Sequence, residues 1–177
     1  MQMTDEIWDL LDADLNPTDE THVRGVPMPE GRKHLVVSAA VIRRDGYILI
    51  AQRAATKTLP LTWEISAGSA LTGETSREAA LRELREEVGV HCAADELTLL
   101  GRVIETSAVF DMYATAVDGE VDIVVDPEEV EGAKWITLDE FDRMVDSGEL
   151  ASYWHKRIVP LRAPLGEFFA ANQAVTA

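Results

Sequence analysis

The most continuous hydrophobic segment of the chain is Leu35–Ile42, in which a single serine interrupts the aliphatic side chains. Such a run without alternation is typical of a strand covered on both faces. Tyr47–Ala51 follows a tight turn and predicts a second buried strand, and Leu97–Glu105 and Ala108–Val117 predict a further pair. These strands, with a few helices between them, predict an α+β domain built as an αβα sandwich around a mixed β-sheet.

The clearest helix is Ser76–Val88. Thr75 precedes it and Glu78 stands three positions later, which is the spacing of a capping box, and Gly89 ends the pattern. Apolar residues also recur at helical spacing near the C-terminus and predict a last helix from about residue 149 past Phe169.

The remaining segments complete the expected organisation. Glu6–Leu11 and Thr21–Gly25 predict the arms of a hairpin, so we expect residues 1–34 to form a hairpin extension and residues 35–177 the main domain with its C-terminal helix. The acidic loop at Asp118–Glu131 includes a candidate strand at Val121–Val125.

Composition narrows the class of partner. The chain has 177 residues, 32 acidic against 16 basic side chains, a formal net charge of -16 and one cysteine. This charge disfavours nucleic acid polymers and anionic membrane surfaces, and one cysteine allows no internal disulfide. Residues 1–14 lack a basic-then-apolar signal pattern, so we expect a cytoplasmic protein. The sequence leaves monomer and homodimer both open.

Three glutamates share one side of the predicted helix. Residues three and four apart lie on the same helix face, so Glu83, Glu86 and Glu87 project together and repel one another. Clustered carboxylate oxygens suit Mg2+ or Mn2+, which would neutralise them. The alternative is a solvated acidic face, which Glu86 and Glu87 alone would favour.

The wider spacing favours the metal site. Gly68 is followed after five residues by Glu74, then after seven by Arg82-Glu83-Leu84, with Glu86-Glu87, Gly89 and Val90 beyond. All nine defined positions resemble the Nudix box, for which a chance match is on the order of one in ten million. The resemblance implies a sandwich domain that cleaves, with divalent cations, the diphosphate of a nucleoside diphosphate linked to another moiety.

The resemblance also implies roles for individual residues. One carboxylate, Glu83 or another, would deprotonate the attacking water, and Arg82 and Glu74 would brace loop and helix through an ion pair. The implied metal ligands are the Gly68 carbonyl, Glu83, Glu86 and Glu87. Many Nudix enzymes use a further carboxylate from a later loop, for which Glu129 is our choice by its distance from Trp135. The alternative for Glu129 is an ordinary acidic surface loop.

A narrower resemblance concerns residues 5–140. Arg53 and Lys57, ahead of Trp63, resemble the branch of the superfamily that contains isopentenyl diphosphate isomerase, where the matching cations hold the substrate diphosphate. The alternative is a pair of surface cations. Ala67 and Ser69 stand where the isomerase has its cysteine and histidine, so we expect no isomerase activity.

Three functions from different classes remain to be weighed. The preferred one is a Mg2+-dependent (or Mn2+-dependent) Nudix hydrolase acting on a small nucleoside diphosphate derivative. A non-catalytic Nudix-fold nucleotide-binding regulator usually has a decayed box, and this box is intact. Isomerase activity is the least favoured because of Ala67 and Ser69. His34 is expected to be structural or to face the substrate rather than to bind metal, and Trp63, Phe110 and Tyr113 to be core residues rather than stacking platforms.

Overall fold

The computed structural model describes residues 6–119 and 121–173, so the first five residues of the N-terminal segment discussed above lie outside it. Its strands are β1 (Ile7–Leu11), β2 (Pro17–Val23), β3 (Lys33–Arg43), β4 (Tyr47–Arg53), β5 (Trp63–Glu64), β6 (Ala67–Ser69), β7 (Thr98–Ile104), β8 (Ala108–Val117) and β9 (Val130–Thr137). Its helices are α1 (Ser76–Val88), α2 (Leu138–Ser147), α3 (Trp154–Ile158) and α4 (Arg162–Asn172), with 3-10 turns at Ala94–Glu96 and Val159–Leu161.

The central strand β3 explains why its sequence is apolar throughout. It pairs in parallel with β8 from His34 opposite Ala108 to Arg43 opposite Val117, and antiparallel with β1, β4 and β6 along its length. Successive side chains of a strand point to opposite faces. Both faces of β3 are covered by helices, so both sets of side chains must be apolar.

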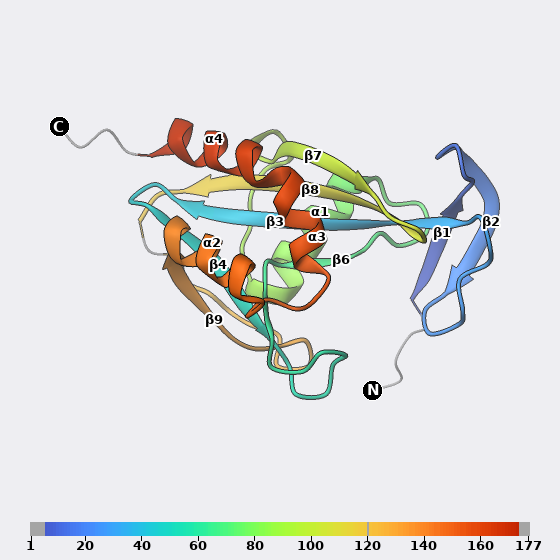
Figure 1. Ribbon diagram of the computed structural model, residues 1–177, viewed down its shortest axis with the longest axis horizontal. Helices are drawn as coiled ribbons and strands as arrows, with labels where there is room; N and C mark the ends of the chain where they lie inside the picture. Colours follow the sequence, from blue (N-terminus) through green and yellow to red (C-terminus); the bar gives the residue numbers. More distant parts are fainter. Residues whose placement is uncertain (1–5, 120, 174–177) are drawn as a thin grey trace.

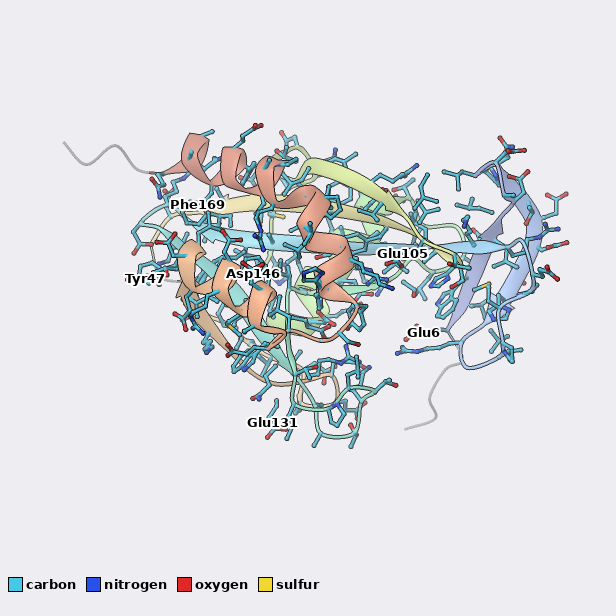
Figure 2. All side chains as sticks on the ribbon, viewed as in Figure 1. Glu6, Tyr47, Glu105, Glu131, Asp146 and Phe169 are labelled. Carbon is cyan, nitrogen blue, oxygen red and sulfur yellow. The ribbon has the colours of Figure 1, made fainter. Side chains whose placement is uncertain are left out.

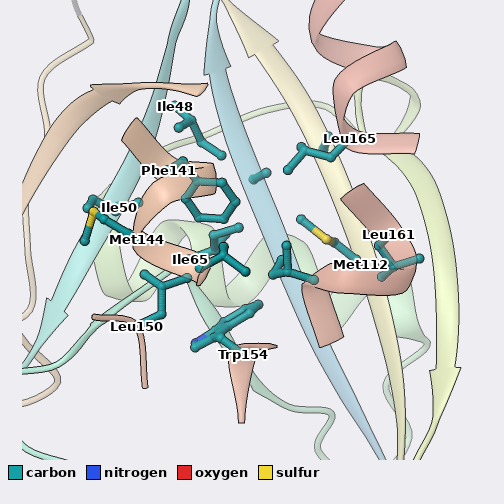
Figure 3. Packing of buried hydrophobic residues seen from close by; sticks show 14 of the residues in the cluster. Ile48, Ile50, Ile65, Met112, Phe141, Met144, Leu150, Trp154, Leu161 and Leu165 are labelled. Carbon is teal, nitrogen blue, oxygen red and sulfur yellow. The ribbon is translucent and has the colours of Figure 1, made fainter. Parts of the chain in front are cut away.

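Two hydrophobic cores lie on the two faces of the sheet. On one face Val36, Ala40 and Ile42 pack with residues of α2, α3 and α4, and Figure 3 shows Phe141, Trp154 and neighbouring side chains of this core. On the other face the intervening residues of β3 pack against α1. Figure 1 shows α2, α3 and α4 on one side of β3 and α1 on the other, which is the expected αβα sandwich with a mixed sheet.

The N-terminal hairpin is present and belongs to the same sheet. β1 pairs with β2, whose start at Pro17 is earlier than expected, and β1 continues onto β3 through Leu10 opposite His34. Figure 1 shows the hairpin at the far end of β3, beside the loop that precedes α1. No helix among the described residues is long and apolar enough to cross a membrane.

Two predicted elements are wrong. Val121–Val125 forms no strand, because this segment bonds to the end of α1 instead: the Val124 amide donates to the Val88 carbonyl at 3.2 Å. The C-terminal helix does not start at residue 149, because the Ala151 amide donates to the Trp63 carbonyl of β5 at 3.0 Å. The helix begins at Trp154 and is divided by the turn that contains Pro160.

Candidate active site

Helix α1 fixes the direction of the acidic side chains. Thr75 caps the helix, with its Oγ1 accepting from the Glu78 amide at 3.3 Å and its amide donating to Glu78 Oε2 at 2.8 Å. Gly89 ends it with a φ of 69°, which favours glycine. The predicted bounds of this helix are confirmed. Its apolar face lies on the sheet, so the face with the glutamates is directed at the strand and loop before it.

The glutamates line one pocket. Glu83, Glu86 and Glu87 contribute to a pocket of about 340 Å³, together with Gly68 and Glu129. Glu83 lies against Gly68, since a Cβ placed on Gly68 would stand 2.0 Å from Glu83 Oε1. Only a glycine therefore permits this position of the carboxylate.

Burial perturbs two of these carboxylates. Glu87 is 7% exposed and accepts hydrogen bonds from Ser66 Oγ at 2.6 Å and from the Ala67 amide at 3.1 Å. Burial, reinforced by the nearby charges of Glu83 and Glu64, raises the pKa of Glu87 well above its usual range. Burial also raises the pKa of Glu83 to about 7, although the Arg82 guanidinium opposes this. Two carboxylates held in this way are stabilised in their charged form by a cation.

Arg82 joins the loop to the helix. Its Nε lies 2.7 Å from Glu74 Oε1, and its Nη2 donates to the Ser69 carbonyl at 2.9 Å, so the expected ion pair with Glu74 is present. The same guanidinium reaches Glu83 at 2.8 Å and Glu86 at 3.2 Å. Arg82 is thus a positioning residue for two of the acidic side chains.

Arg53 lines the pocket, and buried neighbours hold its guanidinium in place. Its Nη1 lies 2.7 Å from Glu64 Oε1 and 3.2 Å from the Tyr153 hydroxyl, and its Nε donates to the Thr58 carbonyl at 2.7 Å. Glu64 is 4% exposed and also accepts from Tyr153 and from Trp154 Nε1. Glu64 was not predicted; its signal in the sequence is a single acid between two apolar residues, Trp63 and Ile65.

Lys57 and Glu129 lie next to each other in the lining of the pocket. The Lys57 ammonium forms an ion pair with the Glu129 carboxylate, and both residues line the pocket. Asp126 lines it too, and its carbonyl accepts from the Glu129 amide at 3.1 Å. The loop that carries Glu129 therefore reaches the box, as its selection as a further ligand requires.

The oxygen donors of the pocket are of the kind that a divalent cation prefers. All the candidate ligands are carboxylate or carbonyl oxygens, which are the donors that Mg2+ and Mn2+ prefer. Within residues 6–119 and 121–173, no three acidic, histidine or cysteine side chains already converge as a formed metal centre. Arg82 and Lys57 provide the positive charge beside these carboxylates. The carboxylates therefore fit a divalent cation that would take the place of Arg82 or Lys57 as their positive partner.

The histidines and the three suggested aromatic residues lie elsewhere. None of them is among the residues that line the pocket. Phe110 and Tyr113 are buried in the two cores, as expected, and Trp63 is half-buried under the Lys134 ammonium. His34 stacks on Trp8 with a centroid distance of 4.2 Å, which is a structural role.

The N-terminal hairpin supplies pocket residues that the sequence analysis did not name. Glu6 just before the first arm, Trp8 on that arm and Arg24 after the second arm line the pocket. Figure 2 shows Glu6 on the side of the hairpin that faces the rest of the molecule. Sequence spacing offered no signal for them, because only the pairing of β1 with β3 brings them here.

The fold and the site define a hydrolase of the Nudix class, and comparison with known proteins agrees. The family model for the NUDIX domain matches residues 32–159. An uncharacterized Nudix hydrolase of Listeria monocytogenes is 35% identical over 157 residues, covering 84% of this chain and 90% of the relative. The chain belongs to the Nudix family and is a Nudix hydrolase.

Other similar proteins cover the fold and part of the sequence. The CTP pyrophosphohydrolase of Escherichia coli is 38% identical over 91 residues, covering 47% of this chain and 67% of the relative. Among solved structures, DR0079 of Deinococcus radiodurans superposes with a TM-score of 0.70 at 23% identity, covering 86% of this chain and 98% of that chain. A Francisella tularensis NMN adenylyltransferase/ADP ribose pyrophosphatase complexed with AMP and a Mn ion has a TM-score of 0.59 at 18% identity, covering 79% of this chain and 43% of that chain.

The narrower resemblance is also found. An isopentenyl-diphosphate Delta-isomerase of Cereibacter sphaeroides is 29% identical over 157 residues, covering 81% of this chain and 83% of the relative. In this chain Ala67 and Ser69 stand on β6 beside the Gly68–Glu83 contact, and both line the pocket. Neither side chain can exchange a proton with carbon as a cysteine thiol can.

Proposed function

We propose that this Nudix hydrolase cleaves the diphosphate of a nucleoside diphosphate linked to another moiety, with Mg2+ or Mn2+ as cofactor. The observation that carries the proposal is that the box brings two carboxylates together in the pocket: Glu83 packs on Gly68, and the buried Glu87 accepts from Ser66 and Ala67. The two charges oppose each other in this place, and a divalent cation would relieve that repulsion.

Each residue of the pocket then has a task. The Gly68 carbonyl, Glu83, Glu86, Glu87 and Glu129 would hold the cation, which when bound screens phosphate charge and lowers the pKa of water. One carboxylate of the pocket, Glu83 or another, would accept the proton of the attacking water. Arg82, paired with Glu74, keeps Glu83 oriented.

Arg53 and Lys57 would hold the diphosphate. Arg53 presents its guanidinium from a buried network, so it is oriented before the substrate arrives. Lys57 pairs with Glu129, and its ammonium would be free to bind a phosphate oxygen if that carboxylate served as a metal ligand. Both groups would then meet the negative charge that builds up as the P–O bond breaks.

The names of similar proteins support this class. The Escherichia coli relative is a CTP pyrophosphohydrolase, and the Francisella tularensis structure is an ADP ribose pyrophosphatase with AMP and a Mn ion. Both names refer to small nucleotides. A small anionic substrate would meet four cations in the pocket of this acidic chain, Arg24, Arg53, Lys57 and Arg82.

A panel of nucleoside diphosphate compounds with Mg2+, Mn2+ or a chelator tests the proposal. We expect metal-dependent release of a nucleoside monophosphate and a second phosphate-containing product from at least one compound. Turnover that is equal in chelator, or no turnover of any diphosphate, would contradict it.

A further inference from the structure

The hairpin β1–β2 forms a wall of the pocket that the reaction itself does not require. Glu6, Trp8 and Arg24 line the same pocket as the box residues and lie outside residues 32–159 that match the family model. A wall at this place contacts whatever is attached to the diphosphate. The chemistry of these three side chains therefore indicates what that moiety is.

The hairpin is hydrogen-bonded to the loop of residues 70–75, which leads from β6 to α1. The Thr72 amide donates to the Ile7 carbonyl at 2.8 Å, and the Gly73 amide donates to Asp9 Oδ2 at 2.8 Å. Leu10 pairs with His34 on β3. The hairpin is thus bonded to the rest of the molecule on both sides of Trp8.

The indole of Trp8 is oriented by its neighbours. His34 stacks on it at 4.2 Å and 12° between planes, and His22 packs at 6.0 Å. Its Nε1 is buried and has no hydrogen-bond acceptor among the described residues. His34 covers one face of the indole, and Trp8 is half-buried and lines the pocket, so the exposed part of the ring is available to a flat ligand.

The rest of the pocket excludes a long apolar tail. Apart from Trp8, the apolar lining consists of Ala67 and Gly68, and every other lining residue is polar or charged. Beside the indole, Arg24 and Glu6 form an ion pair at 2.5 Å and are 49% and 37% exposed. A nucleobase, which is flat and has polar edges, could stack on Trp8 and form hydrogen bonds with Glu6 and Arg24. A prenyl chain would instead be placed against charged side chains.

We propose that the hairpin binds the nucleobase of the substrate, stacked on Trp8 with its polar edge beside Glu6 and Arg24. This inference rests on the proposed function and adds that the base lies at the hairpin, whereas the diphosphate lies at the box. The diphosphate would then extend from the base at the hairpin to the carboxylates of the box, which line the same pocket.

Binding measured without turnover tests the proposal separately from hydrolysis. Calorimetric titration with Mg2+ would compare the four nucleoside monophosphates with ribose 5-phosphate, which lacks only the base. The variants are Trp8→Leu, Trp8→Phe and, as the matched control, Trp135→Leu, because Trp135 does not line the pocket. Arg24→Met, at an exposed position, gives a second test should Trp8→Leu fail to fold.

We expect at least one nucleotide to bind more tightly than ribose 5-phosphate. Trp8→Leu should weaken that nucleotide about 5- to 100-fold, the range of one base–aromatic stack, and leave ribose 5-phosphate unchanged. Trp8→Phe should restore most of the loss, Trp135→Leu should cause none, and Arg24→Met should weaken the nucleotide alone by at least about threefold.

Three results would overturn the proposal: equal affinity of every nucleotide and ribose 5-phosphate, an equal loss for both ligands in Trp8→Leu, or a change below about twofold in Trp8→Leu and Arg24→Met. Hydrolysis of the diphosphate panel is scored independently. Metal-dependent hydrolysis with any of these results would leave the function standing and remove only the base site.

Discussion

Glu83 rests directly on Gly68, so close that a Cβ on the glycine would be 2.0 Å from the carboxylate oxygen. Gly68→Ala should displace the carboxylate, because its end is the only part of the contact that can move. We expect kcat/KM to fall at least about 100-fold, which is about 2.7 kcal/mol, while the melting temperature changes little. Gly132→Ala is the matched control, since nothing lies within 4 Å of a Cβ there. Full activity of Gly68→Ala would show that Glu83 needs no fixed position.

The ion pair between Arg53 and Glu64 allows the effect of Arg53 on stability to be separated from its effect on activity. Arg53→Ala should lower kcat/KM and also destabilise the fold by about 3 kcal/mol, because it leaves Glu64 buried without its cation. Adding Glu64→Gln should restore stability but not activity. Thermal unfolding and kinetics of the single and double variants check this. If the double variant recovers both, Arg53 acts only in folding.

Lys57 predicts a change in KM with an intact fold. Lys57→Met should raise KM for the diphosphate substrate about 10- to 150-fold, with a smaller effect on kcat. This change corresponds to about 1.5–3 kcal/mol, the range for a charge-assisted hydrogen bond. Steady-state kinetics at saturating Mg2+ measure this, with Lys134→Met as the control because Lys134 does not line the pocket. A change in KM below about threefold would remove Lys57 from substrate binding.

His34 predicts a pH dependence of stability. Burial lowers the pKa of His34, so the folded protein takes up the proton less readily than the unfolded chain. Its contribution to stability is therefore full above the ordinary pKa of 6.5 and is lost as the pH falls through the lowered value. The free energy of unfolding should decline less steeply below pH 6.5 in His34→Gln than in the wild type. Parallel pH profiles would contradict this.

Isomerase chemistry should be absent. Ala67 and Ser69 offer no thiol or imidazole beside Gly68, so incubation with isopentenyl diphosphate in deuterium oxide should give no exchange above buffer. Exchange that depends on Mg2+ and on the protein would contradict the assignment of these two positions.

The sequence predicted the parts of the site that depend on local spacing. Helix α1, its caps and its three glutamates follow from intervals of three and four residues, and the structure keeps the predicted bounds. The contact of Arg53 with Tyr153 spans 100 positions and depends on where α3 packs, which no local pattern records. Trp8 reaches the pocket only through the pairing of β1 with β3. Val121–Val125 has strand composition, but its backbone groups bond to the end of α1.

Metal-dependent turnover by variants of the glutamate pair tests the central claim most directly. Glu87→Gln keeps an acceptor for Ser66 and removes one buried charge, so the metal-free protein should be as stable as the wild type or slightly more so. With Mg2+, Glu87→Gln and Glu86→Gln should nearly abolish hydrolysis of the diphosphate substrate, whereas the exposed Glu131→Gln should not. Hydrolysis at the wild-type rate in Glu87→Gln, or a sharp loss of metal-free stability in it, would show that these carboxylates are structural and contradict the account.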